Sequence, residues 1–188
     1  MEAFLISTGI VALAEMGDKT QLLALVLAAR FKRPWPIVWG ILVATLLNHA
    51  LAGLAGAWIM AAAGPSVMRW VLGVSFIAMA LWMLIPDKLD DENALPKRRM
   101  GVFFVTVWAF FLAEMGDKTQ IATVALGAQY QPLIAVVLGT TFGMMLANAP
   151  VVFFGDAITR KVPIALVHRV AAGIFAVLGV LALFGVGP

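Results

Sequence analysis

The chain has 188 residues, of which 63% are hydrophobic and only 12% are charged, with a formal net charge of +3. Ordinary soluble domains carry roughly 25% charged residues, so this composition excludes a soluble globular protein. The chain has no cysteine, which excludes disulfides, thiolate metal sites and cysteine catalysis.

Six apolar stretches are each long enough to cross a membrane as a helix. About 20 helical residues span a hydrocarbon core of about 30 Å. The stretches lie at about residues 4–29, 36–62, 67–85, 102–128, 132–155 and 164–187. We therefore expect an all-α polytopic membrane protein with six transmembrane helices.

The basic residues predict how these helices are oriented. Ten of the 13 Lys and Arg residues fall in three alternate loops: Arg30, Lys32, Arg33, Lys88, Lys97, Arg98, Arg99, Arg160, Lys161 and Arg169. Basic loops stay in the cytoplasm, so both termini are expected on the outer, periplasmic side of the cell (inner) membrane. Because the basic residues sit in loops rather than on one face, they do not indicate a nucleic-acid partner.

A nine-residue sequence, LAEMGDKTQ, occurs at residues 13–21 and again at 112–120. The repeat divides the chain into two three-helix halves, 1–85 and 101–188, joined by a hydrophilic acidic and basic linker at 86–100, expected in the cytoplasm. Because each half has an odd number of spans, the second enters the membrane from the opposite side. The halves are thus predicted to be inverted repeats, as is common in secondary transporters.

Each copy of the motif places two acids and a lysine near the middle of an apolar span. The glutamate of each copy lies about 17 Å into its span, at 1.5 Å per helical residue. An ionisable residue at the centre of a membrane helix costs about 2.5–3.5 kcal/mol on insertion scales, so six of them argue against a purely structural repeat. Inversion would bring four acids together: Glu15, Asp18, Glu114 and Asp117.

Charge and ligand type suggest what these acids bind. Four carboxylates and the two lysines, Lys19 and Lys118, total −2, which complements one divalent cation. Oxygen ligands favour hard ions such as Ca²⁺, Mn²⁺ or Mg²⁺. Without the cation, carboxylates packed together would take up protons, so metal and protons would compete for one site.

On a continuous helix the motif has a definite geometry. Glu15 and Asp18, at i and i+3, would share a face, and Lys19 at i+4 would pair with Glu15. The threonines of the two copies, Thr20 and Thr119, are expected to bond their own backbone. The second copy would repeat this arrangement with Glu114, Asp117 and Lys118.

Other polar and small residues support the predicted site. Gln21 and Gln120 could offer carbonyl oxygens to the cation or form hydrogen bonds between helices, and both readings stay open. Asn48 and Asn148 could reach the site from the second and fifth spans. Small residues on those two spans would let them pack closely against the motif helices: Gly40, Ala44, Gly139 and Gly143.

The paired motif is similar to a known signature. Two copies of E-x-G-D-K-T, here EMGDKT at 15–20 and 114–119, resemble the calcium/manganese cation–proton antiporter family, which has bacterial, Golgi and chloroplast members. The resemblance implies a transporter rather than an enzyme, with Mn²⁺ or Ca²⁺ as transported ion, H⁺ as counter-ion and no cofactor. It implies that Glu15, Asp18, Glu114 and Asp117 are the ligands. Membrane lipid is the expected surrounding, and a homodimer is compatible with this build.

Three alternatives predict different features. An exporter of a small organic cation or amino acid would need a pocket for an organic group, whereas the repeated polar groups here are small oxygen donors. An intramembrane aspartyl protease would need G-x-G-D, but Glu15 stands where the first glycine is required. A structural subunit would not need the buried charges. The preference between Mn²⁺ and Ca²⁺ stays open.

Overall fold

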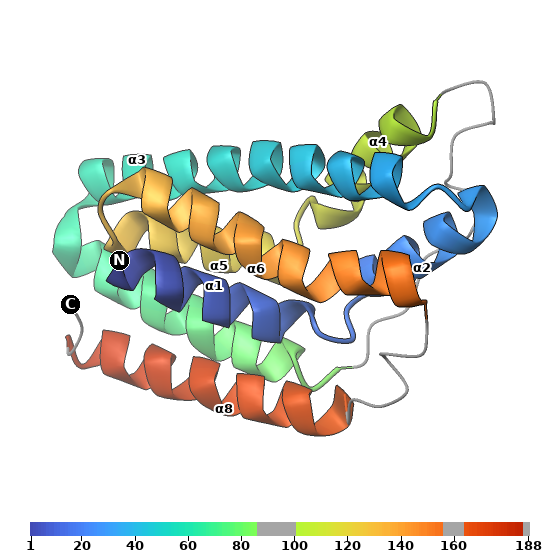
Figure 1. The fold of residues 1–188 in the computed structure, drawn as a ribbon. Coiled ribbons are helices and arrows are strands. Elements are labelled where there is room, and N and C mark those ends of the chain that lie inside the picture. The colour runs from blue at the N-terminus through green and yellow to red at the C-terminus, as the bar shows by residue number, and fades with distance from the viewer. Residues whose placement is uncertain (86–100, 156–163, 186–188) are drawn as a thin grey trace.

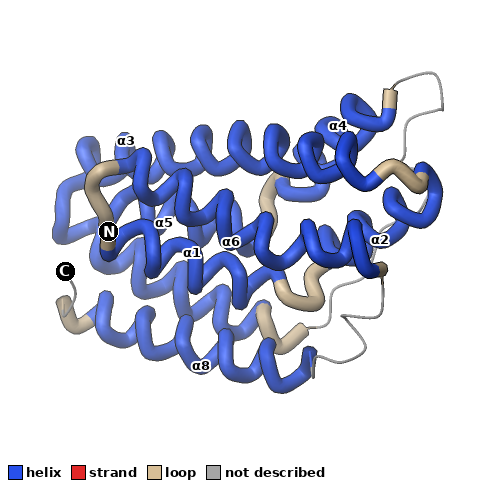
Figure 2. The backbone as a smooth tube through the Cα atoms, viewed as in Figure 1, coloured by secondary structure: helices blue, strands red, loops and turns tan. Residues whose placement is uncertain are grey.

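The computed structural model describes residues 1–85, 101–155 and 164–185, and every element in these ranges is a helix. The predicted all-α fold is therefore confirmed. Figures 1 and 2 show the helices lying roughly along one axis. They are α1 (Glu2–Glu15), α2 (Lys19–Phe31), α3 (Pro34–Trp82), α4 (Val102–Glu114), α5 (Lys118–Gln129), α6 (Leu133–Phe154) and α8 (Ile164–Leu183).

Among the residues that the structure describes, three helices are long and apolar enough to cross a membrane: Pro34–Gly64, Leu133–Phe154 and Ala165–Leu183. Two further apolar helices, Ser66–Trp82 and Val102–Glu114, are shorter. α3 consists of two legs, because Gly64 has φ 75° and ψ 170° and interrupts the helix. The second leg turns back at Gly64 and lies beside α8 (Figure 1), where Phe76 contacts Phe175.

The prediction of continuous helices over 4–29 and 102–128 is wrong, because each breaks inside its motif. α1 ends at Glu15 and α2 begins at Lys19, while α4 ends at Glu114 and α5 begins at Lys118. At both breaks a methionine is extended and the following glycine has positive φ, 81° at Gly17 and 74° at Gly116. Glycine adopts this conformation without the penalty that a Cβ would add, so the local sequence favours the break.

Glycines on α3 and α6 let these helices pack closely against the motif helices. A Cβ at Gly139 would lie 2.5 Å from the carbonyl oxygen of Phe4 on α1, and one at Gly143 would lie 2.6 Å from that of Thr8. Gly40 on α3 comes similarly close to α4, since an added Cβ there would lie 2.6 Å from the Cβ atom of Thr106. The predicted close packing at these three glycines is confirmed.

The apolar core of the described residues falls into two clusters with a polar layer between them. One cluster joins α1, α5, α8, the second leg of α3 and the start of α6. The other joins α2, α4, the start of α3 and the end of α6. Figure 1 shows α2 and α4 toward one end of the bundle and α1, α5 and α8 toward the other. The two helix breaks lie between these ends, and the buried acids lie at the breaks.

Candidate metal centre

The two breaks place four acids at helix ends inside the protein. Glu15 and Glu114 are the last residues of α1 and α4, and Asp18 and Asp117 are the N-caps of α2 and α5. At each break the aspartate N–H donates to the glutamate carbonyl oxygen, over 3.0 Å in the first copy and 3.1 Å in the second. Helix C-terminal ends carry partial negative charge, so the ends of α1 and α4 favour a cation here.

The two glutamines hold the breaks in place. The N–H of Gly17 donates to Gln21 Oε1 over 3.0 Å, and that of Gly116 donates to Gln120 Oε1 over 2.7 Å. Each glutamine amide also donates to the other half: Gln21 Nε2 to the Ala147 carbonyl at 2.9 Å, and Gln120 Nε2 to Asn48 Oδ1 at 2.6 Å. Both glutamines therefore support the site by fixing the glycine turns and by bonding between helices.

We expect Gly116→Ala to lower the free energy of unfolding by about 1–2 kcal/mol, because a Cβ is unfavourable at φ 74°. The space itself is open, with no atom within 4 Å of the added Cβ. Gly9→Ala is the matched control, since Gly9 also has open space but lies within α1. Alanine should raise stability there by about 0.5–1 kcal/mol. Thermal unfolding in detergent measures both, and equal shifts of the same sign would contradict the account.

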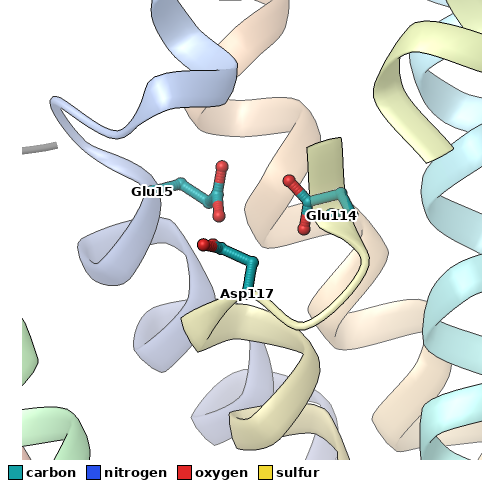
Figure 3. A group of neighbouring side chains, drawn as sticks. All are labelled: Glu15, Glu114 and Asp117. Atoms are coloured by element: carbon teal, nitrogen blue, oxygen red, sulfur yellow. The ribbon is translucent and has the colours of Figure 1, made fainter. Parts of the chain in front are cut away.

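Three carboxylates converge between the breaks. Glu15, Glu114 and Asp117 each offer one oxygen, and these oxygens all lie within 4.8 Å of one another. Figure 3 shows the three side chains pointing toward a common centre. All three residues are at most 1% exposed. Ligands on opposite sides of a Ca²⁺-sized ion are about 4.6–5.2 Å apart, so one hard cation fits this spacing.

Each of these acids has an oxygen available for a ligand. Glu15 Oε1, Glu114 Oε1 and Asp117 Oδ2 are buried and accept no hydrogen bond within the described part of the chain. Buried polar atoms in proteins are nearly always hydrogen-bonded, so open oxygens on three neighbouring acids indicate a site for a cation or protons.

The threonines orient the two glutamates. Thr20 Oγ1 donates to Glu15 Oε2 over 2.5 Å, and Thr119 Oγ1 donates to Glu114 Oε2 over 2.8 Å. Asn148 Nδ2 also donates to Glu15 Oε2, over 3.4 Å. The expectation that the threonines bond their own backbone is wrong, because the helix break turns each hydroxyl toward the acid five residues before it.

The lysines pair across the two motifs. Lys19 Nζ lies 2.9 Å from Asp117 Oδ1, and Lys118 Nζ lies 2.7 Å from Asp18 Oδ1. The predicted pairing of Lys19 with Glu15 within one helix is wrong, because the break removes the helical i, i+4 relation. Asp18 lies outside the group of three converging acids. Its other oxygen is 3.5 Å from the Thr20 backbone nitrogen at the start of α2.

His168 on α8 is a residue near the site that the sequence did not single out. Its Nε2 lies 2.7 Å from the carbonyl oxygen of Met16, in the first break. The aligned position in the first half is Met68, so no repeat signal marks this histidine. A histidine on a distant apolar helix gives no sign in sequence of the backbone it touches.

The described residues thus form a helical bundle with membrane-length apolar helices, two broken helices and buried acids at the breaks. This build defines a membrane transporter for a small cation. The model of the family "Divalent cation/proton antiporter GDT1" matches residues 3–91 and 102–187, and the chain belongs to this family.

Curated relatives resemble the chain over most of its length. A Vibrio cholerae protein named "Putative manganese exporter" is 52% identical over 176 residues, covering 93% of this chain and 87% of the relative. The Arabidopsis thaliana protein "GDT1-like protein 5" is 26% identical, covering 96% of this chain and 94% of the relative. "GDT1-like protein sll0615" of Synechocystis is 25% identical, covering 86% and 88%. No solved structure matches the chain.

Proposed function

We propose that the chain exports Mn²⁺ in exchange for protons, with Glu15, Glu114 and Asp117 as the cation site. The observation that carries this is the convergence of three buried carboxylates, each with an open oxygen, at two helix breaks. Membership of a divalent cation/proton antiporter family gives the ion class. Mn²⁺ rather than Ca²⁺ is supported by the name of the Vibrio cholerae relative.

The charges of the site favour exchange of one divalent cation for two protons. Each aspartate has a lysine within 3 Å, 2.9 Å for Asp117 and 2.7 Å for Asp18. Four ionised acids and two charged lysines leave a net charge of −2, wherever each ammonium lies. One divalent cation or two protons would neutralise it equally. Transport is then electroneutral, and acid on the metal side would compete with the metal.

We propose the inverted six-span architecture as the frame for this exchange, with halves 1–85 and 101–188 and the linker 86–100. Each half makes the same kind of contact with the other half. Gly139 of the second half packs on α1 of the first, and Gly40 of the first half packs on α4 of the second. The crossed lysine pairs follow the same relation. Placement in the cell membrane with both termini outside follows from the basic loops.

The organic-cation or amino-acid exporter is the less favoured function. The groups that converge at the site are carboxylates, and their oxygens within 4.8 Å leave room for an ion rather than an organic molecule.

Purified protein in liposomes tests the proposed function. When the vesicle interior is more acidic than the outside, the pH gradient should drive Mn²⁺ uptake. A pH dye inside should then report proton loss from the vesicle as the metal enters. Clamping the membrane potential with valinomycin and K⁺ should leave the rate of Mn²⁺ uptake within about twofold of the rate without the clamp. Mn²⁺ movement without a pH response would contradict exchange, and amino-acid transport alone would favour the other exporter.

A further inference from the structure

Asp117 has two roles, and both of them bring positive charge to the same carboxylate. It is one of the three acids whose oxygens converge, and one of its oxygens also lies 2.9 Å from Lys19 Nζ. A divalent cation held by Asp117 would repel an ammonium at this distance, because like charges this close in a protein interior interact strongly. With Lys19 at Oδ1 and a metal at the open Oδ2, each positive charge weakens the binding of the other to this carboxylate.

The two lysines differ in how far they can move. The Lys118 side chain is 1% exposed and lies beside Asp18, which is outside the converging group. The Lys19 side chain is 26% exposed, so it is less tightly enclosed than that of Lys118. A long, flexible lysine stem lets the ammonium swing outward while the backbone stays in place.

The position of Lys19 also depends on the acids around it. Lys19 is the first residue of α2, where the helix N-terminus carries partial positive charge and disfavours a cation. The carboxylate of Asp117 makes the ion pair that holds the ammonium there, and the charges of Asp18 and Glu114 add to the attraction. A metal on that carboxylate offsets its attraction for Lys19 and adds a repulsion between the metal and the ammonium.

We propose that Lys19 is a tethered substitute for the transported cation: its ammonium balances Asp117 in the metal-free site and withdraws when a divalent cation binds. This inference rests on the proposed cation site of Glu15, Glu114 and Asp117. When the metal leaves, Lys19 returns and balances the buried carboxylate of Asp117. Its return also helps to release the metal. The two motifs, identical in sequence, then have different tasks, since Lys118 keeps its partner throughout.

Mn²⁺ binding to purified protein in nanodiscs, followed by the electron paramagnetic resonance signal of free Mn²⁺ at fixed pH, tests this inference. Lys19→Gln should tighten Mn²⁺ binding by about tenfold, within the usual range of coupling between two ligands. Lys19→Arg keeps the charge and should bind within about threefold of the wild type. Arg30→Gln is the matched control, because it removes one positive charge from the exposed end of the same helix and should change nothing.

A purely structural lysine predicts the opposite result, since its loss would disturb the site and weaken binding. Unchanged or weaker binding in Lys19→Gln, beside a wild type that binds, overturns the inference alone. Equal tightening in Arg30→Gln also overturns it, since net charge would then be the cause. No Mn²⁺ binding by the wild type would overturn the proposed function as well. Lys19→Met removes the same charge and decides the matter if the glutamine variant does not fold.

Discussion

Glu15→Gln and Asp117→Asn should each reduce Mn²⁺ transport in liposomes to that of protein-free vesicles. Both acids are buried, and each offers an oxygen to the same centre. An amide keeps the shape but removes the charge that pairs with the metal. Losing one partner of a buried charge pair costs about 2–5 kcal/mol, which is on the order of 30-fold or more in affinity.

Glu2→Gln is the matched control for these variants. Glu2 begins α1, the helix that ends at Glu15, and it is exposed. The same change of glutamate to glutamine there should leave transport within about twofold. Wild-type rates in both Glu15→Gln and Asp117→Asn would remove these acids from the mechanism.

Asp18→Asn should lower the free energy of unfolding by about 3–5 kcal/mol, the usual cost of removing one partner from a buried ion pair. Asp18 and the Lys118 side chain are at most 1% exposed, and their charged atoms lie 2.7 Å apart. The expected effect is therefore on folding stability, whereas Asp117→Asn should act mainly on metal binding. Chemical denaturation in detergent, followed by tryptophan fluorescence, measures the difference.

The double variant Asp18→Asn/Lys118→Gln provides the control. Replacing both charges with neutral groups removes the imbalance, so most of the lost stability should return. A double variant as unstable as the sum of its single variants would show that the pair is not coupled. Asp18 would then have to act through other contacts.

Composition and periodicity were enough to predict the class of fold, because a membrane-length helix needs only a long apolar stretch. The same criterion gave a wrong prediction at the motifs, because the stretch 4–29 is apolar and long enough to be predicted as one continuous helix. Glycine followed by aspartate carries a local signal for a helix end and a new helix start. Gly17 and Asp18 show that this local signal prevails over the apolar stretch around it.

The residue content of the candidate site could be predicted, but its pairing could not. The repeat identified the four acids, and three of them converge. Which lysine meets which aspartate depends on how the two halves cross, and sequence spacing within one motif holds no information about that. Lys19 therefore pairs with Asp117, 98 positions further along the chain, rather than with Glu15.

Crystals grown with Mn²⁺ and measured at the manganese absorption edge test the central claim most directly. We expect one anomalous peak between the helix breaks, with oxygens of Glu15, Glu114 and Asp117 about 2.0–2.6 Å away, the range for hard divalent cations. A peak bound elsewhere, with these three carboxylates free of metal, would contradict it.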